Sequence, residues 1–390
     1  MNYYILPKNN NIFKLCPKLH DDIINNITPY TSYSLFKNYN DIMLQIKDIE
    51  KEYSTEFVNN ILKLVHSHEY IFSFIPGTKI CISKLKACTN VFYDLYEILL
   101  SLNIFEQFTS SINALYISEN CDDMSICHNL LRKDNCDTVI NIESIDNNIT
   151  DVKICSYNFI FYQIENKEFY NINQYIIQLF KILRIILLNQ TSSGICILKI
   201  DTIFYKPIID ILYILCSLYE KVGIIKPNTS NITSFEKYIV CSNFILSKEK
   251  KELYNNYIMC IDSFLSEYED EKNKNIISII LNDIPAYFLN KIDDISIIFG
   301  QQQLETIDQI INILKNKNKD EKIEFLKKTN IQKSISWCEK FRVPYFKFSE
   351  KPNIFLPLQQ NIDIHEENIN ENNIYEENTI INENIIMDNK

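Results

Sequence analysis

One residue whose type and position could serve a chemical function is a lysine at the end of an apolar segment. Lys199 lies in the run Ile195-Cys-Ile-Leu-Lys-Ile200, whose β-favouring residues predict a buried strand. Lysine is rarely found in a buried strand unless its ammonium group reaches a cleft or a carboxylate. Because open α/β sheets bind ligands at the carboxyl ends of their strands, Lys199 is expected either to line a cleft or to form a salt bridge.

The cysteines offer a second kind of chemistry. Twelve are spread along the chain without a Cys-x-x-Cys pair, and most lie in apolar runs. This pattern predicts buried free thiols in a reducing compartment such as the cytoplasm. A zinc site made by Cys121, Cys127, His128 and Cys136 is the alternative, but its spacing matches no common zinc motif. No metal is therefore expected.

Glycine and charge exclude some classes of function. The 390 residues include only four glycines, where average usage would give roughly 27, so glycine-rich loops that cradle phosphates or cofactors are disfavoured. The net charge is -11; residues 361–390 hold eight acidic side chains and one basic, or -7, which leaves -4 for the first 360 residues. The chain therefore has no overall positive field that would attract nucleic acid. The net charge does not exclude a local basic groove.

Short apolar runs alternate with helical patterns in the middle of the chain. Four such runs predict strands, over residues 114–118, 138–142, 157–162 and 195–200. Helices are expected between or after them, over 170–189 and 205–221. This alternation predicts an α/β fold with a doubly wound, mostly parallel sheet. The segments 223–226 and 237–241 are joined by a turn too short for a helix, so the last strand should return antiparallel.

The same patterns divide the chain into four parts. We expect a mostly helical, polar N-terminal segment over residues 1–75 and the α/β domain over 76–245. A helical C-terminal region should follow over 246–350, and an acidic, Asn-rich disordered tail over 351–390.

Several helices and the absence of membrane segments can be predicted more closely. Spacing predicts an amphipathic helix over 57–65 and another over 91–102 with Thr89 as its cap. An apolar stripe from Leu304 to Leu314 predicts a further helix. The most apolar helical stretch, 175–188, is too short for a membrane span. Since the chain also lacks a secretory signal pattern, we expect a soluble protein.

Residues 194–241 resemble the FtsJ-like RNA ribose 2′-O-methyltransferases, especially the cap-methylating branch and its relatives in large DNA viruses. The resemblance is carried by a strand with Gly194-x-x-x-x-Lys199, a following helix, the turn Lys226-Pro-Asn-Thr-Ser230, and Glu236-Lys-Tyr238 on an antiparallel last strand. It implies a Rossmann-like methyltransferase fold, S-adenosylmethionine as cofactor and RNA, including the mRNA cap, as substrate.

The resemblance also implies a catalytic Lys-Asp-Lys-Glu tetrad, in which a lysine takes the proton of the ribose 2′-hydroxyl. Lys199 matches the central lysine and Glu236 matches the glutamate. Gln163 replaces the aspartate, and Asp94 stands in the region of the first lysine. A carboxylate near Lys199 would raise the pKa of that lysine, which is the wrong direction for a base.

Further positions follow from the family pattern. The glycine-rich cofactor turn after the first family strand is replaced by Asn120-Cys-Asp-Asp-Met124, with Glu119 as a remnant of cofactor binding. Side chains then occupy the space that glycines leave open. In the turn after the lysine-bearing strand and its helix, Lys226 and Ser230 are the candidate RNA-binding residues, while Asn231 replaces the family arginine.

Three functions remain open at this stage. The first is a pseudo-methyltransferase of a large DNA virus that binds no S-adenosylmethionine and instead binds RNA or an active partner in viral mRNA processing. The second is an active S-adenosylmethionine-dependent mRNA cap 2′-O-methyltransferase. The third is a structural or assembly protein that uses the inherited fold. All three place the protein in the host cytoplasm or the virion.

Overall fold

A computed structural model describes residues 2–346, apart from positions 11–12, 21–27, 52, 79, 86, 88, 134, 146–155, 164–171, 271–273 and 316–319. The chain divides into two compact units, Met1–Tyr345 and Phe346–Lys390. The predicted acidic tail lies outside the described residues, so the fold below is that of the first unit.

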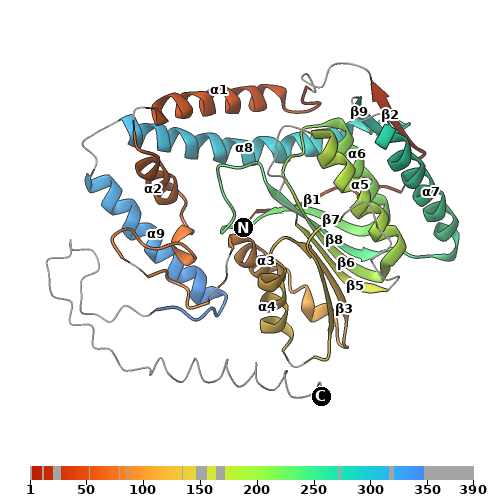
Figure 1. Ribbon diagram of the computed structural model, residues 1–390, viewed down its shortest axis with the longest axis horizontal. Helices are drawn as coiled ribbons and strands as arrows, with labels where there is room; N and C mark the ends of the chain where they lie inside the picture. Colours follow the sequence, from red (N-terminus) through yellow and green to blue (C-terminus); the bar gives the residue numbers. More distant parts are fainter. Residues whose placement is uncertain are drawn as a thin grey trace, which may run out of the picture. The chain divides into compact units, whose positions relative to one another are not determined.

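A seven-stranded mixed sheet forms the centre of this unit (Figure 1). Its strands are β1 (Asn2–Ile5), β3 (Asn113–Ser118), β4 (Thr138–Ile142), β5 (Tyr157–Gln163), β6 (Gln190–Ile200), β7 (Tyr219–Lys226) and β8 (Lys237–Phe244). Their order across the sheet is β1-β7-β8-β6-β5-β3-β4. The first parallel strand, β3, therefore has β4 on one side and β5 followed by β6 on the other, as in Rossmann-like sheets.

The strand directions confirm the predicted fold class. β3, β4, β5 and β6 pair in parallel, whereas β8 pairs antiparallel with both β6 and β7 and lies between them. The turn between β7 and β8 is too short for a crossover helix, so these two strands could pair only as a hairpin. The chain is thus a mixed α/β protein with a mostly parallel sheet.

Strand β1 is a correction to the expected helical start of the chain. It pairs antiparallel with β7, with Ile5 opposite Gly223. The aromatic ring of Tyr3 lies so close to Gly223 that a Cβ atom there would come within 2.2 Å of it. Any larger residue at position 223 would force the Tyr3 ring to shift, and this contact involves a residue 220 positions away, beyond the reach of local pattern.

Helices cover both faces of the sheet (Figure 1). α5 (Ile172–Asn189) and α6 (Lys206–Leu218) pack on one face, and α3 (Asn90–Ser101) and α4 (Cys121–Arg132) lie on the other. Side chains of a strand alternate between the faces: Leu115 and Ile117 join the core formed with α5 and α6, whereas the hydroxyl of Tyr116 contacts His128 of α4. Both faces are buried, which is why these strands are almost wholly apolar.

The flanking regions contain both helices and strands. The helices are α1 (Tyr33–Glu50), α2 (Thr55–Val65), α7 (Lys248–Asp270), α8 (Ala286–Lys315) and α9 (Asp320–Lys340), with short 3₁₀ turns η1 (Glu69–Ile71) and η2 (Phe105–Gln107). The predicted stripe faces inward in α8, since Ile307, Ile311 and Leu314 are buried against α1 and α2. Among the described residues, no helix is both long and apolar enough to cross a bilayer.

A second, two-stranded sheet was not predicted. β2 (Leu15–His20) pairs antiparallel with β9 (Asn275–Ile280), although both segments were expected in mostly helical regions. The buried carboxylate of Asp210 in α6 accepts a hydrogen bond from the backbone N–H of Ile279 at 2.8 Å. The strand β9 is therefore specified by a partner strand and a helix that are distant in the sequence.

Thr89 corrects a smaller prediction. It precedes α3 as expected, but its side chain makes no capping hydrogen bond. Its hydroxyl group instead donates to Oδ2 of Asp123 in α4 at 2.7 Å, and its backbone N–H donates to the same oxygen at 2.8 Å. Because Asp123 is buried beside α3, Thr89 joins the two helices instead of closing one of them.

Candidate functional site

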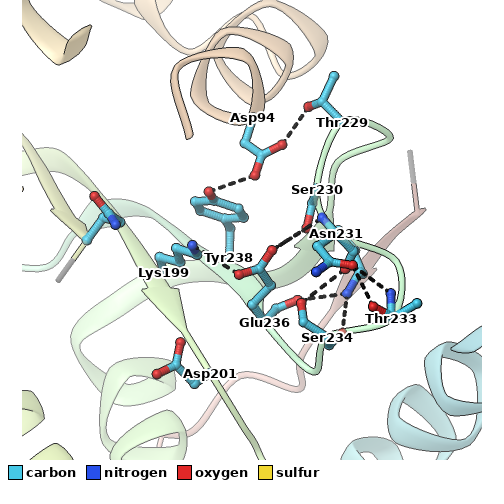
Figure 2. Close-up of polar contacts among 12 residues, drawn as sticks. Asp94, Lys199, Asp201, Thr229, Ser230, Asn231, Thr233, Ser234, Glu236 and Tyr238 are labelled. Atoms are coloured by element: carbon cyan, nitrogen blue, oxygen red, sulfur yellow. Dashed lines mark hydrogen bonds and ion pairs between the residues drawn. The ribbon is translucent and has the colours of Figure 1, made fainter. Parts of the chain in front are cut away.

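A buried ion pair lies at the carboxyl end of β6. Nζ of Lys199 is 3.0 Å from Oε2 of Glu236, the residue that precedes β8 (Figure 2). The exposed fraction of the side chain is 8% for Lys199 and 16% for Glu236. Packing of β8 against β6 thus brings together Lys199 and Glu236, the two residues that the sequence resemblance assigns to a tetrad.

Asp94 faces this pair from helix α3. Its carboxylate is fully buried and accepts hydrogen bonds from the hydroxyl groups of Thr229, at 2.5 Å, and Tyr238, at 2.9 Å (Figure 2). Tyr238 is the cross-strand partner of Lys199, so its ring stands on the same face of the sheet. Burial, followed by the negative charge of Glu236, raises the pKa of Asp94 to about 7.

The electrostatics of the site favour a charged lysine. Burial alone would lower the pKa of Lys199, but the carboxylates of Glu236 and Asp94 outweigh it and hold the pKa above its ordinary value. Burial would raise the pKa of Glu236, yet Lys199 and Lys226 keep it below its ordinary value. Lys199 is therefore protonated and Glu236 ionised at neutral pH, as in a salt bridge.

Gln163 ends strand β5 on the same edge of the sheet. It is the direct neighbour of Ser118 in β3, whose hydroxyl group donates to Oε1 of Gln163 at 2.7 Å. Nε2 of Gln163 is buried and has no hydrogen-bond partner among the described residues. An amide cannot carry the negative charge of the family aspartate, so this end of the site supplies hydrogen bonds only.

The turn in which the resemblance implies a cofactor is short. β3 ends at Ser118 and α4 begins at Cys121, which leaves only Glu119 and Asn120 between them. Glu119 is exposed. In the first turn of α4, Met124 is fully buried and Asp123 is tied to α3.

These residues do not fit the methionine part of S-adenosylmethionine. A glycine turn lets the backbone approach a ligand closely, whereas the start of α4 is packed with a buried methionine and a buried carboxylate. The buried carboxylate of Asp123 is, moreover, already bonded by two donors of Thr89.

The turn between β7 and β8 is stabilised by hydrogen bonds among its own residues. The Lys226 ammonium group donates to the backbone carbonyl oxygens of Ser234, at 2.6 Å, and Glu236, at 3.2 Å. Burial lowers the pKa of Lys226 to about 8. The hydroxyl group of Ser230 and the backbone N–H of Asn231 both donate to Oε1 of Glu236 at 3.3 Å. Both candidate RNA-binding residues are thus buried and contribute to the shape of the turn.

Glu97 is a site residue that sequence reasoning missed. It is buried one helical turn after Asp94 in α3, and its Oε2 accepts hydrogen bonds from the indole N–H of Trp337 at 2.9 Å and the backbone N–H of Asn228 at 3.0 Å. Burial raises its pKa. Two acidic residues three positions apart in an otherwise apolar helix were the available signal, since both carboxylates bind the same turn.

The described residues contain no group of three or more His, Cys, Asp or Glu side chains placed to hold a metal ion. In particular, both ring nitrogens of His128 are engaged: Nδ1 lies 2.8 Å from the Tyr116 hydroxyl, and Nε2 lies 2.9 Å from Oδ2 of Asp137. The zinc alternative at this histidine is therefore replaced by a buried hydrogen-bond network. The cysteines that the structure describes are free, and Cys127 is fully buried.

Comparisons with known proteins give only distant likenesses. No protein-family model matches the sequence, and no curated protein resembles it significantly. Among 39 matching chains of solved structures is one described as a ribosomal RNA methyltransferase from Plasmodium falciparum, with 14% identity and a TM-score of 0.30 over 39% of this chain and 97% of that one. Another is described as a hemolysin from Streptococcus thermophilus, with 11% identity and a TM-score of 0.27 over 48% of this chain and 78% of that one. Likenesses this weak say nothing about activity.

Proposed function

We propose that this protein is a pseudo-methyltransferase that binds RNA in mRNA processing of a large DNA virus and transfers no methyl group. The proposal combines the family resemblance of residues 194–241 with the geometry at Lys199. Its RNA-binding part rests on that resemblance.

One observation supports the proposal that the protein does not catalyse methyl transfer. A general base must lose its proton near the working pH, but Lys199 is paired with Glu236 at 3.0 Å and faces the buried carboxyl group of Asp94. Both acidic groups raise the pKa of the lysine. The resemblance implies a lysine in the region of Asp94, and a second ammonium group there would have lowered that pKa.

The cofactor turn supports the same proposal. Met124 and Asp123 are buried where the resemblance implies a glycine turn. If a diverged pocket nevertheless held S-adenosylmethionine, the exposed Glu119 would be the carboxylate placed to bind it, and the cofactor would supply an electrophilic methyl group. Isothermal titration calorimetry should detect no S-adenosylmethionine binding at millimolar ligand, and a micromolar Kd would overturn the proposal in favour of an active methyltransferase.

RNA binding is expected to depend on the turn that Lys226 and Ser230 hold. Fluorescence anisotropy with a labelled single-stranded RNA should show binding that weakens steeply with salt, since phosphate contacts release counterions. The double variant Lys199→Met, Lys226→Met should bind more weakly, because the turn loses the ammonium groups that hold its shape. Lys221→Met, which removes an exposed charge from β7, serves as the matched control.

Two outcomes would contradict RNA binding. One is no detectable RNA affinity of the wild-type protein, which would favour a structural or assembly role. The other is unchanged affinity in a folded double variant. If the variant fails to fold, hydrogen exchange of the wild-type turn 228–234 takes its place: RNA should slow exchange there, and no change would count against the proposal.

A further inference from the structure

A cavity of about 390 Å³ lies next to the β7–β8 turn, on the side of helix α2. It is lined by residues of α2, the segment after it, the start of α3, the turn and α8: Asn59, Leu62, Lys63, His66, Glu69, Phe72, Asn90, Thr229, Asn231, Ile232, Thr233 and Thr306. Lys199 and Glu236 are not part of this lining. The volume is in the range of small-molecule sites.

The walls of this cavity are held in place by the fold. Nε2 of His66 lies 2.8 Å from the backbone oxygen of Ser230, which fixes the segment after α2 to the turn. The ring of Phe72 stacks on Tyr93 of α3, with 5.8 Å between centroids. Oδ1 of Asn231 accepts bonds within the turn from the backbone N–H and hydroxyl groups of Thr233, which rigidifies that wall. Such a pre-formed site loses little free energy to ordering when it binds.

Charge limits what the cavity can bind. Lys63 and Glu69 are the charged residues of the lining, and they have opposite signs. A polyphosphate would need several cationic groups, and a divalent cation would need several carboxylate or carbonyl oxygens. The lining therefore suits a ligand with no large net charge.

Hydrogen-bond acceptors at one corner call for a ligand with N–H or O–H donors. Because a carbonyl oxygen accepts only, Nε2 of His66 is the donor to Ser230, and in the neutral ring Nδ1 is an acceptor. Nδ1 is buried without a hydrogen-bond partner, and Oε2 of Glu69 lies 3.7 Å from it, beyond hydrogen-bond distance. Oε1 of Glu69 already accepts a hydrogen bond from the hydroxyl group of Ser73, so Oε2 of this lining residue is the oxygen that a ligand donor would reach.

The remaining lining combines apolar surface with amides. Leu62, Phe72 and Ile232 offer apolar contacts, while Asn59 and Asn90 offer both donors and acceptors. A nucleobase has a flat apolar face and an edge of donors and acceptors, and amide side chains pair with such edges. We infer that this cavity binds one nucleoside, either free or as an unstacked nucleotide of single-stranded RNA.

The inference does not depend on the proposed function, because a free nucleoside needs neither Lys199 nor RNA. Saturation-transfer NMR and calorimetry with the four ribonucleosides should detect at least one that binds the full chain. Asn59→Trp should weaken this binding at least tenfold, since the exposed rim position can carry an indole into the cavity. Asn60→Trp, the adjacent exposed position outside the lining, is the matched control.

A second variant tests the acceptor. In Glu69→Gln the amide oxygen can keep the hydrogen bond from the Ser73 hydroxyl group, whereas the second carboxylate oxygen is replaced by a donor, so affinity should fall several-fold without loss of fold. Lys221→Met, at an exposed position of β7 outside the lining, should leave nucleoside affinity unchanged. Free-nucleoside binding identifies a small-molecule site; protection of the cavity residues by single-stranded RNA alone identifies an unstacked nucleotide. No binding of either probe, equal loss in both tryptophan variants, or preferred binding of a sugar such as maltose would overturn the inference.

Discussion

The carboxylate of Asp94 accepts a hydrogen bond from the hydroxyl group of Tyr238 at 2.9 Å, and this bond joins helix α3 to strand β8. Tyr238 is also the cross-strand partner of Lys199. The bond therefore fixes a carboxyl group beside the lysine that the family resemblance identifies as the base. The same helix reaches the β7–β8 turn through Glu97, so α3 sets both the charge and the shape of the site.

The Lys199–Glu236 pair predicts strongly coupled stability effects. Lys199→Met should lower the free energy of unfolding by about 3–5 kcal/mol, because it leaves a buried carboxylate without its partner. Glu236→Gln should cost a similar amount. The double variant should lose clearly less than the sum of the two, as measured by urea denaturation at pH 7. Additive losses would mean that the pair does not interact in solution.

Asp94 predicts that stability depends on pH. Its pKa is about 7 in the folded protein and near 3.8 in an unfolded chain, so the folded state binds the proton more tightly. Stability should therefore fall as pH rises from about 4 to about 7, by at most about 1.4 kcal/mol per pH unit, and then level off. In Asp94→Asn this slope should shrink, as followed by thermal unfolding across that range.

Glu305 provides the control for this experiment. It is exposed on α8, and Glu305→Gln should retain the wild-type slope. A slope equal in Asp94→Asn and wild type would show that Asp94 is not the titrating group.

The bond between Glu97 and Trp337 predicts a link between α3 and α9. Trp337→Phe removes the indole donor at 2.9 Å but keeps an aromatic ring, so it should cost about 1–3 kcal/mol. Because the ring packs on Tyr93 and Phe341, near-UV circular dichroism should report the change. Phe325→Leu, at an exposed position of the same helix, should change stability little. Equal losses in the two variants would contradict the role of the hydrogen bond.

The buried network around Asp137 predicts a second pH effect, at acid pH. Arg132 binds Asp137 through two nitrogen atoms and holds the pKa of that carboxylate below its ordinary value against the opposing effect of burial. The stabilisation is present above about pH 4 and is lost as pH falls through the folded-state pKa. Asp137→Asn should cost about 3–5 kcal/mol at pH 7, since it leaves the buried guanidinium group unpaired.

Asp122→Asn tests whether this loss is specific. Asp122 is exposed in the first turn of α4, the helix that also carries Arg132. Its replacement should lower the free energy of unfolding by well under 1 kcal/mol. The two variants should be compared by urea denaturation at pH 7 and pH 3. Their difference should narrow at pH 3, because the stabilisation from a carboxylate with a lowered pKa declines below the ordinary pKa of the group.

Local pattern was enough for the central strands and most helices, but it failed where an element depends on a distant partner. The apolar runs of β3, β5 and β6 are continuous because both faces of these strands are covered. β1 and β9 instead depend on distant residues. The Tyr3 ring of β1 packs over Gly223, and the backbone of β9 donates a hydrogen bond to the carboxylate of Asp210. The cap predicted for Thr89 failed for the same reason, because Asp123 of another helix competes for its hydroxyl group.

The sequence by itself determined the α/β class, the antiparallel return of β8, and the positions of Lys199 and Glu236 at strand ends. It also showed that the turn after β3 lacks glycine. Only the tertiary structure decided that Asp94 lies near Lys199 and that Glu97 binds both Trp337 and the β7–β8 turn. The cavity beside this turn is likewise a product of the tertiary structure. The reason is physical: a residue's type sets its charge, but its pKa and partners depend on burial and on distances created when α3, β6 and β8 pack together.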